Sequence, residues 1–508
     1  MSKKKKKNRP GKITTPLAGH KKVGKALVSP IMQLNGLSFS SWVNDRLPEM
    51  LWASLVITVI PRVQALEVFR DIASIGIGYR QADHEQAKGW TLRHSDIPNQ
   101  PRELFNALIS RVLQCHTGMQ ALRPLLLLEN LPGITWWKAA LAVDPIEDDW
   151  QTLAQAVQST FDHQSQEATD VRWVSILFKI ALGEFLFPPE LEEKALEIIE
   201  YPNRGDMRKV RPSIRAMEMT FTNMDESSWP ESFWSYVLQR TGCMPAPLLP
   251  RDKSSNDLKD VRQTLVDVRE ALLEHWFTTL STSGLDPKHD GVFGFGFFAL
   301  SCLAEMITGP LSEGITGRLL LRALTECRIS MAYLVRCGDE TMWKKFRSYG
   351  AGQAKLALLK HEEITGEKPR FVTLATLEGL ANEDYFQEYV QIDLGHWCGK
   401  DLRRLAEESG TKDDYDCYYG WASGFVHGQW GAMRDSNFTH CLNPLHRFHR
   451  VPLSFHRMLE PTTDDALQLV NSILDDVSFV YPGFDARFEI ERALRDEKDK
   501  EKVEAPAV

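Results

Sequence analysis

The 508-residue chain lacks the short-range cysteine pairs that are typical of disulfide scaffolds and zinc fingers. None of its eight cysteines belongs to a Cys-x-x-Cys pair, and there is no His-Glu-x-x-His segment. Phosphate-binding Gly-Lys-Ser/Thr loops and Gly-x-Ser-x-Gly elbows are also missing. These absences argue against a P-loop nucleotidase, a zinc metalloprotease of that type and a serine hydrolase. The lack of closely spaced cysteine pairs favours reduced thiols, and we therefore predict a cytoplasmic location.

Long apolar runs are scarce as well. The segment Leu51–Ile60 is too short to cross a bilayer and is followed by Pro61-Arg62. The most apolar window, Val292–Leu311, contains Glu305, Gly294, Gly296 and Pro310 and is more typical of a buried helix. The lysines at the N-terminus are not followed by an unbroken apolar core, as a secretory signal would require. We therefore predict no membrane span.

Acidic residues are absent from the first 44 positions, which carry ten positive charges before Asp45. The rest of the chain is therefore more acidic than the net charge of −8 suggests. Such a tail attracts nucleic acid through sequence-independent electrostatics, but it is equally typical of a solvated, disordered segment. We predict that residues 1–40 are disordered and that RNA is a possible partner. The charges that would attract RNA belong to Lys3, Lys4, Lys5, Lys6 and Lys7.

Strand patterns are nearly absent, and helical periodicity dominates, so we predict an all-α fold. Residues 41–241 read as an N-terminal helical domain. A segment rich in proline and serine, residues 242–257, is the best linker in the chain. Residues 258–485 read as a C-terminal helical bundle, followed by a charged tail over residues 486–508. In this bundle Leu320, Leu324, Cys327, Met331 and Leu334 alternate at spacings of three and four, which predicts a helix with an inward-facing seam.

The stretch from Trp397 to His440 concentrates the residues with chemical potential. Within it, the segment Tyr415–Gly428 is predicted to form one helix with an apolar face. Gly420, Gly424 and Gly428 form a second row on this helix. Because a glycine inside a helix costs about 1 kcal/mol relative to alanine, the row suggests that a partner packs closely against the backbone. We predict a possible homodimer through this helix.

Several motifs in residues 260–480 resemble a bacterial helical family that is catalogued as a domain of unknown function. The resemblance rests on an Arg-x-x-x-Glu helix and a later Ser-x-x-x-His-Gly helix, here Arg322–Glu326 and Ser423–Gly428, with Trp397–Lys400 between them. Through its His-Gly helix this family is also similar to HEPN-type bundles, many of which are metal-independent ribonucleases in toxin–antitoxin and phage-defence systems. That second likeness concerns the fold, and a fold does not confer a function.

The family motif singles out Arg322, Glu326, Ser423 and His427 as candidate catalytic residues. In this interpretation His427 acts as the acid or base, Arg322 stabilises phosphate charge and Glu326 orients the histidine. The alternative is a buried Arg–Glu–His network that fixes the register of the helices and has no catalytic role. Both readings are compatible with the spacing.

HEPN ribonucleases carry an arginine followed by a histidine after four to six intervening residues. Arg434 and His440 match this spacing, with Asp435 as the polar residue after the arginine. A histidine can accept the proton of an RNA 2′-hydroxyl, and an arginine can stabilise the developing charge without a metal. The segment before Pro444 looks like a loop, however, and pairs with this spacing arise by chance in a chain of this composition. We therefore keep Arg434 and His440 as a reserve pair.

Zinc binding is a third possibility, because several histidines and cysteines fall in one region. None of them shows the paired spacing of a zinc finger, so we predict no metal and no cofactor. The residues of this group are His396, Cys398, Cys417, Cys441, His446 and His449.

Together these patterns predict a cytoplasmic, two-domain bacterial protein with a HEPN-like C-terminal bundle. The predicted function is metal-independent RNA cleavage in a stress or phage-defence setting. The alternative is a non-catalytic helical interaction or sensor protein whose His–Arg–Glu cluster is structural.

Overall fold

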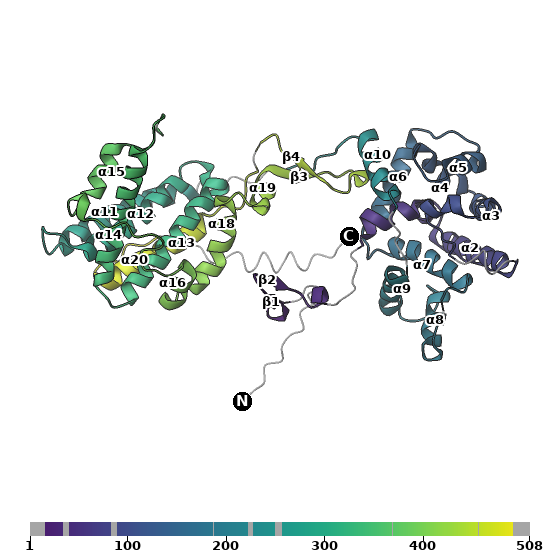
Figure 1. Ribbon diagram of the computed structural model, residues 1–508, viewed down its shortest axis with the longest axis horizontal. Helices are drawn as coiled ribbons and strands as arrows, with labels where there is room; N and C mark the ends of the chain where they lie inside the picture. Colours follow the sequence, from purple (N-terminus) through teal and green to yellow (C-terminus); the bar gives the residue numbers. More distant parts are fainter. Residues whose placement is uncertain are drawn as a thin grey trace. The chain divides into compact units, whose positions relative to one another are not determined.

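The computed structural model describes residues 16–33, 40–82, 89–185, 187–221, 227–248, 257–367, 369–455 and 457–490. The chain divides into two compact units (Figure 1). Unit 1 comprises Met1–Pro245 and His440–His449, and unit 2 comprises Ala246–Thr439 and Arg450–Val508. Helices dominate both units, which confirms the predicted all-α fold. The HEPN-like character of unit 2 stays a prediction.

Unit 1 is built of short helices around one core. Its principal helices are α1 (Leu51–Val59), α2 (Arg62–Ala82), α3 (Arg102–Leu113), α4 (Gly118–Leu122), α5 (Ile134–Leu141), α6 (Asp148–Phe161), α7 (Gln166–Ala181), α8 (Glu192–Ile199), α9 (Met207–Phe221) and α10 (Trp229–Arg240). Shorter helical turns are η3 (Trp42–Arg46), η4 (Pro48–Met50), η5 (His94–Asn99), η6 (Arg123–Leu127), η7 (Pro189–Leu191) and η11 (Pro444–His446).

Helix α1 is the centre of unit 1. Its residues Leu51 to Ile57 are all buried, and it packs against α4, α6 and α7. A helix that is apolar on almost every side has to be enclosed by its neighbours. Tryptophans close the core while their indole N–H groups donate to backbone carbonyls: Trp42 to Thr160, and Trp173 to Ile198. The indole N–H groups of Trp42 and Trp173 are thus satisfied inside the core, whereas the N–H of Trp137 is buried without a partner among the described residues.

Unit 2 is a bundle of long and short helices. They are α11 (Asp257–Thr279), α12 (Pro287–Met306), α13 (Ile315–Arg336), α14 (Thr341–Glu362), α15 (Leu374–Ala381), α16 (Leu402–Ser409), α17 (Lys412–Asp414), α18 (Gly420–Val426), α19 (Trp430–Asn437) and α20 (Thr463–Val480). Helical turns are η8 (Pro310–Glu313), η9 (Gln387–Tyr389) and η10 (Tyr415–Tyr419).

The core of unit 2 lies where α12, α13 and α20 pack against one another. The predicted seam of α13 faces this core: Leu324, Met331 and Leu334 are buried, and Leu320 and Cys327 pack against it partly buried. The alternating spacing of three and four therefore identified the inward face of α13 correctly. Helix α16 and turn η10 cover another part of α13, and this places the candidate residues of the later chain beside Arg322.

Strands are few and short. The first sheet pairs β1 (Lys21–Val23) with β2 (Ala26–Val28) in antiparallel register, after the turn η1 (Leu17–Gly19) and before η2 (Ile31–Gln33). Because these elements fall within the predicted disordered tail, that expectation does not hold for residues 16–33. Lys3 to Lys7 lie outside the described residues, as does most of the predicted charged tail. The second sheet pairs β3 (Phe438–His440) with β4 (Arg450–Pro452).

The predicted single helix over Tyr415–Gly428 is wrong in two details. Residues Tyr415–Tyr419 form a π-helical turn, and the α-helix that follows ends at Val426. Gly428 lies beyond the helix with a φ of +56°, a backbone conformation that glycine adopts without strain. Gly420 has open space where a Cβ would lie, and Gly424 faces the side chain of Gln429. Within the described chain the glycines are thus not a helix-packing row, and the homodimer stays a prediction.

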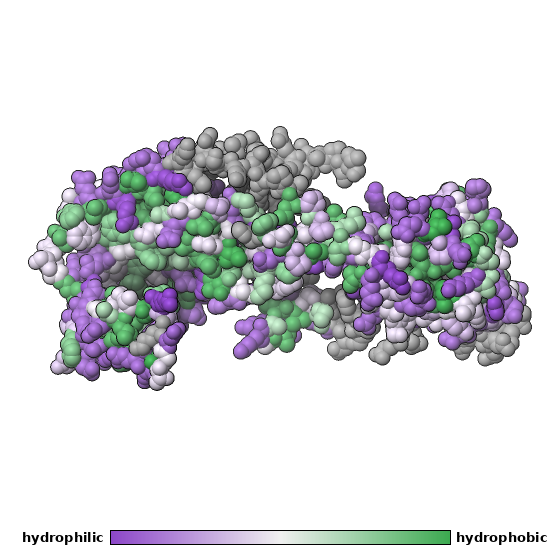
Figure 2. Space-filling model, turned by 90° about the horizontal axis from the view of Figure 1, so that it is seen from above, coloured by the Kyte–Doolittle hydropathy of each residue, from purple (hydrophilic) through white to green (hydrophobic). Residues whose placement is uncertain are grey.

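No helix in the described ranges is long and apolar enough to cross a membrane. In the face shown in Figure 2, hydrophobic residues appear among hydrophilic ones on the surface. The large exposed side chains of unit 2 include two tryptophans, Trp421 and Trp430, that lie close in sequence to His427.

Candidate functional site

Arg322 on α13 is the hub of a polar cluster in unit 2. Its Nε donates to Glu326 Oε1 at 2.9 Å, and its Nη2 donates to the hydroxyl of Tyr419 at 3.1 Å. Its Nη1 lies 3.4 Å from Nε2 of His427. The guanidinium also lies over the Tyr419 ring, 4.9 Å from the centroid, in a cation–π arrangement. One arginine therefore joins α13 to η10 and to the end of α18.

The local backbone explains why these groups meet. The π-helical turn of η10 stacks Tyr415 on Tyr419 with ring centroids 4.8 Å apart, and this stack lies beside Arg322. Single π-helical turns are frequent at functional sites because they shift the direction of the side chains that follow. His427 caps the C-terminus of α18, where its backbone N–H donates to the Ser423 carbonyl at 3.1 Å. The imidazole is exposed at this helix end.

The structure brings together three of the four residues that the family motif singled out, Arg322, Glu326 and His427. Glu326 binds Arg322, and no hydrogen bond or ion pair among the described residues joins it to His427. The hydroxyl of Ser423 has no hydrogen-bond partner in the described chain, although Ser423 lies one turn before His427. Tyr419 was missed as a site residue, because its position on an apolar helix face concealed its hydroxyl.

The reserve pair does not share a helix. Arg434 lies exposed on α19, which ends at Asn437, and His440 lies at the end of strand β3. Arg434 belongs to unit 2 and His440 to unit 1. The HEPN spacing presupposes a continuous helix across both residues, and the extended backbone from Phe438 onward breaks that continuity. The geometry therefore favours the Arg322 cluster over this pair.

Two exposed tryptophans lie close to His427 in sequence. Trp421 is 56% exposed on α18, and Trp430 is 61% exposed at the start of α19. The Trp421 ring lies over Gly431, where an added Cβ would come within 3.3 Å of the indole. The absence of a side chain at Gly431 thus allows this close approach. Exposed indoles of this kind offer flat surfaces on which nucleobases can stack.

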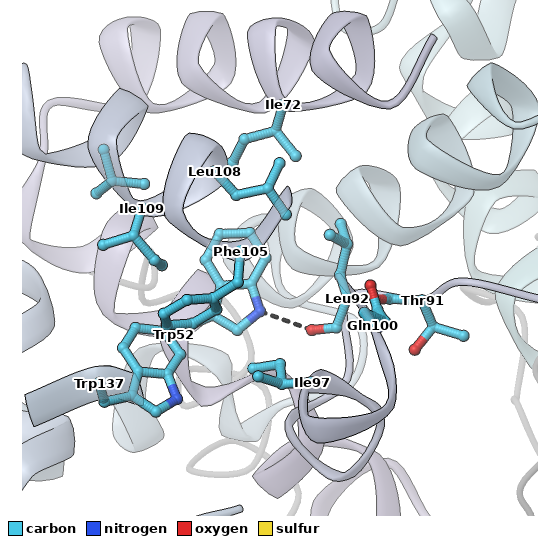
Figure 3. A pocket seen from close by; sticks show the side chains of 11 residues that line it. Trp52, Ile72, Thr91, Leu92, Ile97, Gln100, Phe105, Leu108, Ile109 and Trp137 are labelled. Atoms are coloured by element: carbon cyan, nitrogen blue, oxygen red, sulfur yellow. Dashed lines mark hydrogen bonds between the residues drawn. The ribbon is translucent and has the colours of Figure 1, made fainter. Parts of the chain in front are cut away.

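A cavity in unit 1 offers no comparable chemistry. It holds about 30 Å³ and is lined mainly by apolar side chains from α1, α2, α3 and α5 (Figure 3). Within it, the indole N–H of Trp52 donates to the Leu92 carbonyl at 2.8 Å. A space of this size accommodates at most a water molecule or two and no substrate. The cavity is therefore a packing feature of the unit 1 core.

A larger pocket of about 410 Å³ lies in unit 2, beside α12 and α14. Its two charged lining residues, Arg347 and Asp290, bind each other at 2.8 Å, and Arg347 also binds Asp384 at 2.7 Å. Its thiol, Cys327, is a poor nucleophile because burial raises the pKa of Cys327 to about 12. The pocket thus lacks a free base or nucleophile, and we do not assign it as the reactive site.

The cysteines and histidines that we considered for zinc separate into different places. His396 and Cys398 face each other at 3.2 Å between Nδ1 and Sγ, and Cys417 is exposed on η10. Cys441, His446 and His449 converge in unit 1 with Cys243, which the sequence analysis had not connected with them. Only the sequence proximity of Cys441, His446 and His449 hinted at this second cluster.

Residues 313–442 match the model of a family of unknown function (DUF5677). This match supports the resemblance to a domain of unknown function over a shorter range than the 260–480 expected, and it includes the Arg322, Glu326, Tyr419 and His427 positions. Comparison with curated proteins and with solved structures gives no match.

Proposed function

We propose that unit 2 is a metal-independent ribonuclease whose reactive group is His427, with Arg322 stabilising charge on the phosphate. The observation that carries this proposal is the direct approach of the Arg322 guanidinium to the imidazole of an exposed histidine. When no metal supplies positive charge, phosphodiester cleavage requires an acid–base group and a fixed cation in contact with each other.

The chemistry follows from these two groups. His427 Nε2 accepts the proton of the ribose 2′-hydroxyl, and the 2′-oxygen attacks phosphorus. The bond from phosphorus to the 5′-oxygen breaks, and that oxygen takes up a proton from water or from the imidazolium. The products are a 2′,3′-cyclic phosphate and a 5′-hydroxyl. The Arg322 guanidinium carries five N–H donors, so donors are left for a phosphate oxygen beside the three contacts it already makes.

Exposure distinguishes this proposal from the buried-network alternative. The Glu326 side chain is 43% exposed and His427 lies at the surface. A network that fixes helix register through desolvated charges would be enclosed. The 3.4 Å separation between Arg322 and His427 is also long for a hydrogen bond, so little interaction is lost when a substrate group comes between them. Catalytic contacts are often this loose before substrate binds.

The surroundings suit a single-stranded nucleic acid. Trp421 and Trp430, close to His427 in sequence, provide exposed stacking surfaces, and the lysines at the N-terminus of the sequence add charge that attracts a polyanion. A cytoplasmic role in bacterial stress or phage defence is part of the same proposal. So is a homodimer through the α18 region, which would set two His427 side chains near each other.

The test is incubation of the purified full chain with total RNA in excess chelator. We expect cleavage that leaves 2′,3′-cyclic phosphate ends. His427→Gln should reduce the rate by about 10²–10⁴-fold, the usual contribution of a general acid or base. Arg322→Lys should reduce it by about 10²–10³-fold, because lysine keeps the charge and loses the fork of donors.

His163→Gln is the matched control, because His163 is an exposed histidine of unit 1 and should leave the rate unchanged. Arg434→Ala and His440→Gln test the reserve pair in the same assay. Loss of cleavage in Arg434→Ala with full activity in His427→Gln would transfer the role to that pair. Absence of cleavage by the wild-type chain on every RNA tried would refute the proposal.

A second candidate, a protein-interaction module, rests on the same exposed side chains. Val426 and Met433 accompany the two tryptophans as large exposed apolar residues of α18 and α19. Apolar groups gathered at a surface are typical of partner-binding sites. In that case Trp421→Ala would abolish partner capture, while His427→Gln would leave it unchanged. The RNA assay separates the two functions, because only the nuclease needs the imidazole.

A further inference from the structure

Four metal-binding side chains converge in unit 1, outside the cluster around Arg322. They come from two segments far apart in sequence: Cys243 follows α10, and Cys441, His446 and His449 lie in the segment 440–449. Their ligand atoms all lie within 4.8 Å of one another. Cys243 Sγ is 3.5 Å from His446 Nδ1 and 3.3 Å from His449 Nε2, and Cys441 Sγ is 3.5 Å from His446 Nδ1.

These separations agree with the geometry of one tetrahedral ion. Zinc binds thiolate sulfur at about 2.3 Å and imidazole nitrogen at about 2.0–2.1 Å, so a sulfur and a nitrogen on adjacent corners lie about 3.6 Å apart. The three sulfur–nitrogen distances are therefore within a few tenths of an ångström of those required. Each residue offers one ligand atom, and the four atoms lie close enough together for one ion to reach all of them.

The orientation of His446 is set by a hydrogen bond on its other nitrogen. Nε2 lies 2.9 Å from the hydroxyl of Thr241, which itself donates to the Val237 carbonyl at 2.7 Å. Because the Thr241 hydroxyl proton is donated to the Val237 carbonyl, the Thr241 oxygen accepts a hydrogen bond from the Nε2–H group of His446. The lone pair of Nδ1 is then directed toward the two sulfur atoms. Hydrogen bonds of this kind orient most metal-bound histidines.

The sulfur of Cys441 is prepared in a similar way. Cys441 is fully buried, and its Sγ accepts the backbone N–H of Met244 at 3.3 Å. The two segments are joined by backbone contacts, because Leu442 N–H donates to the Met244 carbonyl at 2.6 Å. Cys243 and Cys441 are therefore held side by side by main-chain structure, with a donor directed at the sulfur that would carry negative charge.

The turn between the two histidines is strained. Arg447 and Phe448 both have positive φ, 51° and 48°, which costs non-glycine residues on the order of 1 kcal/mol each. This turn brings the imidazole of His449 within 5.2 Å of that of His446, measured between ring centroids. Packing holds it in place: Phe448 contacts Phe161 edge-on at 4.5 Å between centroids, and Arg447 stacks over a tryptophan of α10.

We infer that Cys243, Cys441, His446 and His449 form a structural zinc site. Two sulfur and two nitrogen ligands in a tetrahedral arrangement favour zinc over magnesium or calcium, and four protein ligands leave no open position for catalysis. Binding releases the two thiol protons as the sulfurs become thiolates. The ion ties the segment 440–449 to the end of α10. In the sequence these two segments are separated by residues 246–439. This inference is independent of the proposed nuclease.

The experiment is elemental analysis of the untagged full chain, purified without chelator. We expect one zinc ion per chain in the wild type and background levels in Cys243→Ser and His449→Gln. Cys243 is exposed, so its replacement does not disturb the core. The control is Cys417→Ser, because Cys417 is also exposed but lies in unit 2, and this variant should retain the full zinc content.

Cobalt substitution provides a second readout on the same proteins. Tetrahedral cobalt with two thiolates gives intense visible bands and a sulfur-to-metal charge-transfer band, and Cys243→Ser should weaken the latter. Full zinc content in Cys243→Ser would overturn the site. So would a Cys243–Cys441 disulfide in the purified protein, or a wild-type chain that neither contains zinc nor takes it up from a chromophoric chelator.

Discussion

The polar cluster around Asp170 in unit 1 and the cluster around Arg322 in unit 2 differ in exposure. In unit 1, Asp170 is 0% exposed, binds Arg62 at 2.7 Å and accepts a hydrogen bond from the hydroxyl of Tyr201 at 2.7 Å. Unit 2 also buries the ion pair of Arg328 with Asp476, but its Arg322, with a side chain that is 16% exposed, lies beside the exposed His427. Enclosed ion pairs with satisfied hydrogen bonds hold helices together. An exposed histidine beside a half-buried arginine is accessible to a substrate.

This contrast explains why the resemblance to known motifs falls in unit 2 and why the candidate chemistry lies there. It also shows why a buried ionisable residue in unit 1 is a poor indicator of function. At Asp170 the cost of desolvation is offset by Arg62 and Tyr201, whereas at His94 no hydrogen-bond partner among the described residues offsets it. Three measurements test the contrast.

The largest effect is expected from Asp170→Ala in unit 1. It removes the carboxylate that binds Arg62 and Tyr201 and leaves a buried phenol without its acceptor. We expect the free energy of unfolding to fall by about 3 kcal/mol, the lower end of the range for a broken buried pair, because the Arg62 side chain is 30% exposed. Hydrogen exchange resolved by peptide should locate the loss in unit 1. An equal loss of hydrogen-exchange protection in both units would show that the Asp170 cluster does not stabilise unit 1 in particular.

Acid has a smaller effect per pH unit, through His94. This histidine is fully buried beside Trp137 and Trp229, and neither of its ring nitrogens has a partner among the described residues. Burial lowers the pKa of His94 to about 3. Between that value and the ordinary 6.5, the unfolded chain binds a proton that the folded chain does not. Stability should therefore fall as the pH is lowered through this window, by about 1.4 kcal/mol per unit at most.

The measurement is chemical denaturation at a series of pH values, with His94→Phe as the comparison. Phenylalanine keeps the ring and cannot be protonated, so the variant should lose this part of the slope. An identical slope in both proteins would show that His94 has an ordinary pKa.

The smallest effect is expected from Glu326→Gln in unit 2. The pair it breaks is an i, i+4 contact with Arg322 in the less favourable order, and Glu326 is 43% exposed. The free energy of unfolding should change by less than about 1 kcal/mol. A loss as large as that of Asp170→Ala would show that the cluster is structural. Denaturation of both variants under the same conditions gives the comparison directly.

Much of the fold was accessible before the structure. The all-α class and the buried seam of α13 follow from the spacing of apolar residues, since that spacing decides which helix face is removed from water. The family motif pointed to Arg322, Glu326 and His427 because they lie in two short segments of recognisable pattern. In contrast, the hairpin β1–β2 was missed because its strands are three residues long, too short to show a period.

Periodicity and motif spacing report on neighbours along one helix, and they sufficed for the helices and for the pairing of Arg322 with Glu326. They carry no information on which distant segments meet. Tyr419 enters the cluster only because the π-helical turn of η10 sets it beside α13, and Cys243 joins Cys441 only because a segment some two hundred residues later returns to unit 1. Such meetings depend on the packing of whole helices and on backbone contacts between remote segments, and these exist only in the folded chain.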